Sequence, residues 1–284
     1  MATLYIVSTP IGNLGDMTYR AVEVLGSVAR VLAEDTRRTR VLLQHYDIHA
    51  RLVSAHEHNE AARAQRVVEW LDAGDDLALV TDAGTPLVSD PGLRIVQRVL
   101  DAGHQVVPVP GASAALAALV ASGLEPEPFT FLGFAPRTGR ARRERLEEIA
   151  VSSHAVVLYE SPNRLAALLA DLSDLCGGER RVAVARELTK LHETVFRGTL
   201  AEASTHHAGE VRGEVVVVLA GREPATASTA EADEAAARAL AGSLLAEGRR
   251  PSQVARDVAR RLRLPRNRAY EITQSLVEEP ESEP

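Results

Sequence analysis

Short runs of apolar and β-branched residues alternate with longer amphipathic stretches along the first 220 residues of the chain. The runs predict strands, and the stretches, whose apolar positions recur at the helical period, predict the helices that connect them. Before residue 123, strands are expected at 4–8, 31–33, 52–55, 77–81 and 105–108, and helices near 18–29, 37–46, 60–73, 92–102 and 112–122. Strands joined by crossover helices pair in parallel, so this part predicts an α/β domain with a largely parallel sheet.

The segment Gly123–Pro128 interrupts the alternation with a glycine and two prolines and is expected to be a hinge. Beyond it, strands are expected at 129–133, 155–159, 182–186, 194–197 and 214–219, and helices near 140–150 and 162–175. Several of these strands follow one another without a helix between them, which indicates a mixed or antiparallel sheet. We therefore expect a first α/β domain at residues 1–123 and a second at 124–222.

The composition changes again near the C-terminus. Residues 223–230 consist mainly of Pro, Ala, Thr and Ser, which is typical of a linker. Three helix-like segments follow, near 231–247, 251–263 and 266–277, and define a domain at 231–278. The stretch from Arg249 to Arg268 contains eight arginines and one acidic residue, Asp257. Short helices with arginines on the second and third resemble a helix-turn-helix and favour a polyanionic partner, although a solvated helix face is also compatible.

Composition excludes several classes of protein. The chain has 284 residues, 45% hydrophobic and 25% charged, enough for a sizeable core and two or three domains. Its longest low-polarity run, Ala112–Leu124, is too short for a bilayer, and no secretory signal precedes it, so we expect a cytoplasmic protein. The single cysteine, Cys176, excludes an intramolecular disulfide. The net charge of −7 argues against indiscriminate coating of nucleic acid.

Two loops after predicted strands are candidates for binding a small molecule. Thr81–Thr85 follows a buried-looking strand, where open α/β sheets place their ligand crevice. Farther along this loop, Ser89 or Asp90 is expected to cap the next helix. Pro108–Ala114 repeats the arrangement one strand later, with small residues that allow close approach of a ligand or of a helix. The first loop, Ser8–Asp16, lacks the G-x-G-x-x-G pattern of a pyrophosphate site.

Eight motifs, in order and without large gaps over residues 3–221, together resemble the ribosomal RNA small-subunit methyltransferase I family. They are Thr9–Leu14, Glu34–Arg37, His56–Glu60, Asp82–Gly92, Pro110–Ala114, Phe131–Phe134, Tyr159–Glu160 and Arg186–Lys190. The resemblance implies the two-domain tetrapyrrole-methylase fold, which is that of class III S-adenosylmethionine methyltransferases, a helix-turn-helix-like extension and a homodimer. The implied activity is 2′-O-methylation of a cytidine ribose in 16S ribosomal RNA, either free or in the assembled 30S subunit.

By motif position, the resemblance implies that the S-adenosylmethionine cofactor lies between the two domains. It would contact Pro10, Asp82, Ala83, Gly84, Ser89, Ser113, Ala114, Leu158 and Tyr159, and the strand end at 214–221 would close the cleft. A sulfonium with an adenosine tail suits a mostly small and apolar pocket with a few polar contacts.

A ribose hydroxyl is a poor nucleophile, so methyl transfer to it needs alignment and then a proton acceptor. Lys190 is the only lysine among 32 basic residues, and lysine, unlike arginine, can be made neutral by burial. We expect Lys190, held neutral or paired with Glu187, to be the base or the group that orients the hydroxyl; Glu34 is a third catalytic candidate. A purely structural ion pair with Glu187 or Glu193 is the alternative.

Contacts to RNA are expected from Arg37, His56, Arg140, Arg142, Arg143, Arg186, Arg260 and Arg266. Residues 137–145 contain five arginines and one acid, and Arg37 lies at a helix start, where phosphate can bind, although a solvated face is equally compatible. His56 and His58 would share a face on a strand, but no third ligand is evident, so no metal is expected.

Two other functions remain open: methylation of a small molecule such as a tetrapyrrole, and non-catalytic regulation through nucleic-acid binding by the helices at 231–277. The loops Pro10–Leu14 and Asp82–Pro86 and the basic C-terminal helices favour the RNA enzyme. Turnover of S-adenosylmethionine in the presence of RNA discriminates between these functions.

Overall fold

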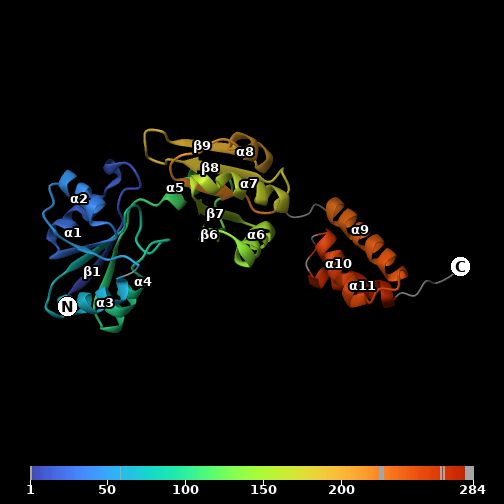
Figure 1. The fold of residues 1–284 in the computed structure, drawn as a ribbon, viewed down its shortest axis with the longest axis horizontal. Coiled ribbons are helices and arrows are strands. Elements are labelled where there is room, and N and C mark those ends of the chain that lie inside the picture. The colour runs from blue at the N-terminus through green and yellow to red at the C-terminus, as the bar shows by residue number, and fades with distance from the viewer. Residues whose placement is uncertain (1, 58, 224–226, 263, 265, 279–284) are drawn as a thin grey trace. The chain divides into compact units, whose positions relative to one another are not determined.

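The predicted alternation of strands and helices is present in a computed structural model that describes residues 2–57, 59–223, 227–262, 264 and 266–278 (Figure 1). The chain forms two units, Met1–Arg222 and Glu223–Pro284, and each is described by itself. No helix in the described part of the chain combines the length and apolarity that a bilayer span requires.

The first sheet is fully parallel, as predicted, with strand order β3-β2-β4-β1-β5. Its strands are β1 (Thr3–Val7), β2 (Arg30–Ala33), β3 (Arg51–Ser54), β4 (Leu77–Val80) and β5 (Gln105–Val109). The connecting helices are α1 (Tyr19–Ser27), α2 (Thr36–His45), α3 (Glu60–Asp72) and α4 (Leu93–Asp101), and a short 3-10 helix, η1, spans Leu14–Asp16.

Both faces of this sheet are buried, which explains why its central strand is uniformly apolar. Leu77 and Leu79 of β4 pack with α3 and α4, whereas Ala78 and Val80 pack with α1 and α2. Figure 1 shows these two pairs of helices on opposite sides of the sheet. Successive side chains of a strand point to opposite faces, so covering both faces with helices leaves no polar position on β4. The carboxyl ends of the strands are then the accessible edge, and this is where the loops after β1, β4 and β5 lie.

The second sheet is mixed, as predicted, with strand order β6-β7-β10-β8-β9. Its strands are β6 (Phe129–Phe134), β7 (Ala155–Glu160), β8 (Arg181–Arg186), β9 (Thr194–Thr199) and β10 (Val215–Leu219); only the β6–β7 pair is parallel. One face packs against α6 (Gly139–Val151), α7 (Pro162–Cys176) and α8 (Leu200–His206).

The other face of the second sheet is covered by α5 (Ala114–Ala121), which the sequence interpretation placed in the first domain. Ala115, Ala118 and Leu119 pack against β7, β8 and β10, so a boundary at residue 123 lies on the wrong side of this helix. The chain therefore passes from one sheet to the other through the loop before Ala114. The apolar sequence of α5 fits a core contact on either sheet, so only the tertiary packing decides between them.

Helix α8 was not predicted, because seven residues are too few to show a helical period. A signal was nevertheless present. Thr199 accepts a hydrogen bond from the Glu202 N–H, and the Glu202 carboxylate accepts one from the Thr199 N–H, which is a capping box.

The capping of α4 differs from the prediction. Its N-cap is Gly92, with φ +126° and no capping side chain, instead of Ser89 or Asp90. The carboxylate of Glu60 accepts hydrogen bonds from the backbone N–H groups of Gly92 (3.1 Å) and Arg94 (2.7 Å). A buried glutamate from α3 therefore satisfies the helix terminus, which leaves Ser89 and Asp90 free for another role.

The second unit contains α9 (Ala227–Ala246), α10 (Pro251–Leu262) and α11 (Arg266–Glu278) around its own apolar core, which includes Ala237, Leu244, Val254, Val258 and Ile272. Helix α9 begins at Ala227, so the predicted linker at 223–230 was drawn too long. Alanine is the best helix former, and it extends the helix into a segment whose Pro, Thr and Ser had suggested a linker.

Candidate active site

The loops of the two sheets enclose a cavity of about 370 Å³, a size typical of small-molecule sites. The first sheet contributes Ile11 after β1, the loop Ala83–Asp90 after β4, and Ser113 and Ala114 after β5. The second sheet contributes residues at four strand ends, which are Phe134, Tyr159 to Pro162, Ala185, Leu188 and Gly213 to Val216. The predicted closure of the cleft by the strand that begins near residue 214 is thus present.

The three loops of the first sheet are tied to one another. Thr9 and Gly84 exchange two backbone hydrogen bonds of 2.8 and 3.0 Å. The Thr85 hydroxyl lies 3.0 Å from the Ser8 hydroxyl and donates to the carbonyl of Ala112 (3.3 Å). Hydrogen bonds between the three loops hold ligand-binding groups in place before a ligand binds.

The loop after β4 is held in an unfavourable backbone conformation. Leu87 and Ser89 have φ of +74° and +70°, in the left-handed region that L-residues avoid. Such conformations persist where surrounding contacts impose them and are concentrated at functional sites. Here the Glu60 contacts at Gly92 and the bridge at Gly84 fix the two ends of the loop, which directs Ser89 and Asp90 to the cavity.

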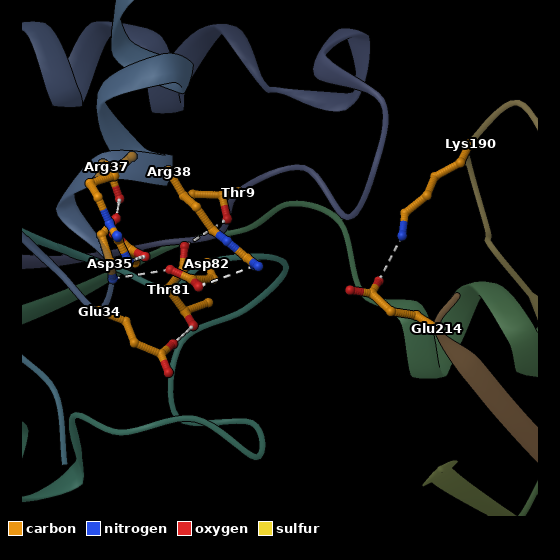
Figure 2. A network of polar contacts seen from close by, with 10 residues as sticks. Thr9, Glu34, Asp35, Arg37, Arg38, Thr81, Asp82, Lys190 and Glu214 are labelled. Carbon is orange, nitrogen blue, oxygen red and sulfur yellow. Dashed lines mark hydrogen bonds and ion pairs between the residues drawn. The ribbon is translucent and has the colours of Figure 1, made fainter. Parts of the chain in front are cut away.

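Six of the nine predicted cofactor contacts line the cavity, namely Ala83, Gly84, Ser89, Ser113, Ala114 and Tyr159. Three do not. Pro10 lies beside the lining residue Ile11. Asp82 accepts a hydrogen bond from the Asp35 N–H (3.1 Å) and pairs with Arg38 (3.3 Å), so its carboxylate orders the loop after β2 (Figure 2).

Leu158 is the third exception. Its side chain is fully buried in the core that β7 forms with the helices on the far face, while its neighbours Val157 and Tyr159 face α5. A side-chain contact of Leu158 with a cofactor is therefore excluded, and only its backbone remains available. Sequence motifs locate such a strand end but do not show which residues of it face the ligand.

Asp90 is a lining residue that the sequence interpretation had assigned to helix capping. Burial, and then the charge of Glu34, raises the pKa of Asp90 from 3.8 to about 6, although a hydrogen bond with Thr81 offsets part of the rise. The Thr81 hydroxyl donates to the Glu34 carboxylate over 3.0 Å (Figure 2). A hydrogen bond that lowers the pKa of a carboxyl group is donated to its ionised form, and a hydroxyl has one proton, so Thr81 can donate to Glu34 or to Asp90 but not to both at once.

Lys190 is charged in this structure and is not the neutral base considered from sequence. Its ammonium donates to Glu187 (2.8 Å) and to Glu214 (3.1 Å; Figure 2). Burial lowers the pKa of Lys190, but these two hydrogen bonds outweigh it and leave the pKa above its usual value. The expected pair with Glu187 is present, whereas Glu193 instead accepts a hydrogen bond from the Thr189 N–H.

The Lys190 loop also meets the first sheet. A Cβ at Gly12 would lie 2.4 Å from Cγ of Lys190 and 2.9 Å from the Thr189 hydroxyl, so only glycine fits there. Glu187 and Thr189 have φ of +53° and +67°, which makes this a second strained loop beside the cavity. Contacts of this kind fix the Lys190–Glu214 pair next to the lining residues Leu188 and Gly213.

Several residues predicted to contact RNA form ion pairs within the chain. Arg142 is largely buried and pairs with Asp171 of α7 (2.7 Å), so its role is to hold α6 on α7. Arg37 pairs with Asp35 (2.8 Å), which is also the N-cap of α2, so a carboxylate of the chain already occupies the helix start where a phosphate was expected. Arg140 pairs with Glu144 on the surface.

The remaining predictions divide into three cases. Arg143 is exposed, and Arg186 lines a separate groove described below. His56 lies in a turn after β3 and not on a strand, and its ring is 3.2 Å from the side-chain amide of Asn59. His58 and the side chains of Arg260 and Arg266 lie outside the described parts of the structure. In the described chain, no three His, Cys, Asp or Glu side chains converge as a metal site would require.

The fold and the site define a class of protein. The family model of the tetrapyrrole (corrin/porphyrin) methylases matches residues 3–204. Two solved structures share the fold: uroporphyrin-III C-methyltransferase from Thermus thermophilus (TM-score 0.55, 21% identity, 77% of this chain and 94% of that one) and the methyltransferase CobJ (TM-score 0.60, 19% identity, 78% and 95%). At these identities they show the fold alone.

Curated relatives narrow the class. Several relatives are named ribosomal RNA small subunit methyltransferase I. The one from Synechocystis sp. is 44% identical, over 97% of this chain and 99% of the relative. The one from Bacillus subtilis is 46% identical, over 78% of this chain and 76% of the relative. The relative of that name in Vibrio cholerae is 48% identical over 77% of each chain. The chain belongs to the ribosomal RNA small subunit methyltransferase I family. It is thus a methyltransferase that uses S-adenosylmethionine, and the cavity of small and apolar residues with a few polar groups fits that cofactor.

Proposed function

We propose that this enzyme methylates the ribose 2′-hydroxyl of a cytidine in 16S ribosomal RNA. The observation that carries the proposal is the high identity, over nearly the whole chain, to relatives whose names specify the RNA of the small subunit. The 30S subunit or its free RNA is the substrate partner. S-adenosylmethionine supplies an electrophilic methyl group, and the chain's own residues align the hydroxyl and accept its proton.

Six of the lining residues predicted from sequence hold the cofactor: Ala83, Gly84, Ser89, Ser113, Ala114 and Tyr159. Pro10 and Leu158 contribute through their backbone, and Asp82 acts indirectly by ordering the loop after β2. The pocket is apolar over most of its lining, which excludes water from the reacting groups and strengthens electrostatic interactions within it.

Asp90, supported by Glu34, is the proton acceptor. It lies in the cavity, it is half-buried, and a second carboxylate faces it through Thr81. With a pKa of about 6 it is ionised at neutral pH and is a stronger base than an ordinary aspartate. Bound S-adenosylmethionine would supply the methyl group, and Asp90 would accept the proton of the ribose hydroxyl.

Lys190 and Glu187 have an orienting role. The Lys190 ammonium is held by two carboxylates, and one of its three protons remains for a substrate oxygen. Because the ammonium is charged, it positions the hydroxyl or a neighbouring phosphate and does not take up a proton. The role of Glu187 is to fix Lys190 and the N–H of Glu214 (2.9 Å) at the cavity edge.

The family resemblance further supports a cytoplasmic homodimer and a helix-turn-helix-like role for the C-terminal helices in RNA binding. Exposed Arg143 and the arginines of α10 and α11 are the proposed phosphate contacts of this kind. Size-exclusion chromatography with light scattering tests the dimer directly.

The test of the function uses labelled S-adenosylmethionine and small ribosomal subunits from cells that lack this enzyme. A single 2′-O-methylcytidine, mapped by nuclease digestion and mass spectrometry, is the expected product. Free ribosomal RNA, large subunits and a tetrapyrrole precursor are the comparison substrates. Cofactor binding without transfer to either form of the RNA would overturn the proposal and favour a small-molecule methylase.

A further inference from the structure

A second cavity, of about 710 Å³, lies at the edge of the second sheet and is not explained by the cofactor site. We call it the β9 groove and define it by Arg186, Phe196, Arg197, His206, His207 and Arg212. It is formed by the edge strand β9, the last turn of α8 and the loop that follows, and the end of β8. It is large enough for a mononucleotide-sized ligand.

The groove also contains one carboxylate, Glu210, which pairs with Arg212 (3.0 Å), so its net positive charge comes from the other arginines. Within the described residues, Arg186 and Arg197 have no carboxylate partner. Arg186 donates to the Thr194 hydroxyl and the Arg212 carbonyl (both 3.3 Å). Arg197 donates to the carbonyl of Ala121 (2.6 and 2.9 Å), which places its guanidinium on the α5 face of β9, opposite to Phe196. Neutral acceptors hold the two guanidinium groups in place without cancelling their charge. A guanidinium has five N–H donors, so both retain donors for an anion.

His207 lies beside Arg186 in the same groove. Burial lowers its pKa first, and the neighbouring His206 and Arg186 lower it further, which keeps this imidazole neutral. Its side chain is buried, and in the described structure its Nε2 atom has no hydrogen-bond partner. Buried polar atoms are nearly always paired, and the described residues of the chain leave this one without a partner.

The groove also offers a planar stacking surface. The rings of Phe196 and His206 are stacked, with centroids 4.9 Å apart and an interplanar angle of 28°, and His207 packs edge-on against His206 (4.7 Å, 84°). Phe196 is part of the core behind β9, whereas His206 is exposed. The outer face of an imidazole supported in this way suits a nucleobase.

The position of the groove relates it to the active site. Arg186 directly follows Ala185, and Arg212 directly precedes Gly213; both of these neighbours line the cofactor cavity. The same ends of β8 and β10 therefore separate the two sites, and an RNA strand that places one ribose in the cavity has adjacent nucleotides within reach of the groove.

We propose that the β9 groove binds an unpaired nucleotide that flanks the target, with its phosphate on Arg186 and its base on His206. This inference rests on the proposed function. The combination of a guanidinium group with a stacking surface favours a ribonucleotide over an acidic peptide, which would use the arginine but not the ring. His207 supplies a neutral hydrogen-bonding edge beside the base.

Two variants of the full-length enzyme test the groove, with anisotropy of a short fluorescein-labelled, unpaired RNA as the binding measurement. Arg186→Gln is expected to weaken RNA binding about tenfold and to lower the dependence of log K on log salt by about one unit. His206→Ala is expected to weaken binding about tenfold with an unchanged salt dependence, because stacking releases no counterion. Both should raise KM for the subunit and leave cofactor affinity and kcat unchanged.

Matched controls are Arg20→Gln and His49→Ala, which alter exposed residues that line neither cavity. Thermal melting establishes that each variant is folded. If both groove variants bind RNA like wild type, if Arg20→Gln weakens binding equally, or if polyglutamate competes as well as RNA, the groove proposal is wrong. If wild type itself neither binds nor methylates RNA, the proposed function fails, which is a separate and recognisable result.

Discussion

Asp90 illustrates how the environment of a single residue changes its chemistry. By sequence it precedes a proline at a helix start, where aspartate is an ordinary cap. The Glu60 carboxylate performs that task instead, so the Asp90 carboxylate remains at the cavity, beside Glu34 and partly removed from water. Two neighbouring carboxylates of like charge are unfavourable for stability, which is a reason to expect a function for them.

Asp90→Asn is expected to lower kcat by roughly 10²- to 10⁴-fold and to leave cofactor affinity unchanged, because it removes the proton acceptor and keeps the side-chain shape. In wild type, kcat/KM should rise with pH through about 6 as Asp90 loses its proton, and the variant should lose this rise. A pH–rate profile with labelled cofactor measures both. Wild-type activity in the variant would show that another group takes the proton.

The same substitution is expected to affect stability in the opposite direction. The pKa of Asp90 is raised in the folded state, so the folded protein binds the proton more tightly than the unfolded chain, and wild-type stability falls as pH rises from about 4 through about 6. Asparagine does not ionise, so Asp90→Asn should be stabilising relative to wild type above pH 6 and not at pH 4. Urea unfolding at the two pH values measures this, and equal shifts at both would contradict a buried, ionised Asp90.

At the scale of elements, long-range partners decide how helices begin and which way strands face. At the start of helix α4, the N–H of Gly92 donates a hydrogen bond to Glu60 of α3, 32 residues earlier in the chain. This contact holds the loop before α4 in its left-handed conformation. Strand β7 separates Leu158, in the core with α7, from Tyr159, at the cavity. Neither arrangement is visible in a local window of sequence.

Glu60→Ala is expected to destabilise the protein by about 1–3 kcal/mol, because two backbone N–H groups at the start of α4 lose their acceptor. Loosening this loop should also weaken cofactor binding, measured by calorimetry. Glu57→Ala, at an exposed position just before α3, is the matched control and should change neither quantity. Equal effects of the two substitutions would contradict the remote cap.

Leu158→Ala is expected to destabilise the protein by about 2–5 kcal/mol through the cavity it leaves in the core of the second sheet. At temperatures where the variant is folded, its cofactor affinity should equal that of wild type, since the side chain does not face the site. Denaturant melts and cofactor titration distinguish this from a contact role, for which affinity would fall with little change in stability.

At the scale of the whole molecule, the chain combines a unit that holds the active site with a helical unit that has a separate core. The core of α9, α10 and α11 uses only residues beyond 222, and the cavity and the β9 groove use only residues before it. Units with independent cores commonly fold independently.

Truncation after Arg222 is therefore expected to leave a folded protein with unchanged cofactor affinity. RNA affinity should fall by about tenfold or more if the arginines of α10 and α11 contact phosphates. Anisotropy with the same RNA, together with a thermal melt, measures the two effects. Unchanged RNA affinity would assign substrate recognition to the first unit alone.

Much of the architecture followed from local pattern, because a strand or helix reveals itself by which positions are apolar. The parallel first sheet, the mixed second sheet and the position of the cofactor loops after β4 and β5 were all predicted in this way, and the eight motifs placed the chain in its family. Where the local signal was short, as in α8, or equally compatible with two partners, as in α5, the prediction was incomplete or wrong.

The sequence by itself determined the order and type of most elements, the loops that line the cavity and the family, since these depend on spacing along the chain. Only the tertiary structure decided the state of the charged groups. Lys190 is charged because two carboxylates accept hydrogen bonds from it. Arg142 and Arg37 form ion pairs with Asp171 and Asp35. The Asp90 side chain is available for another role because Glu60 replaces it as the cap of α4. Charge and hydrogen bonding depend on neighbours in space, and the partners that matter most here are distant in the chain.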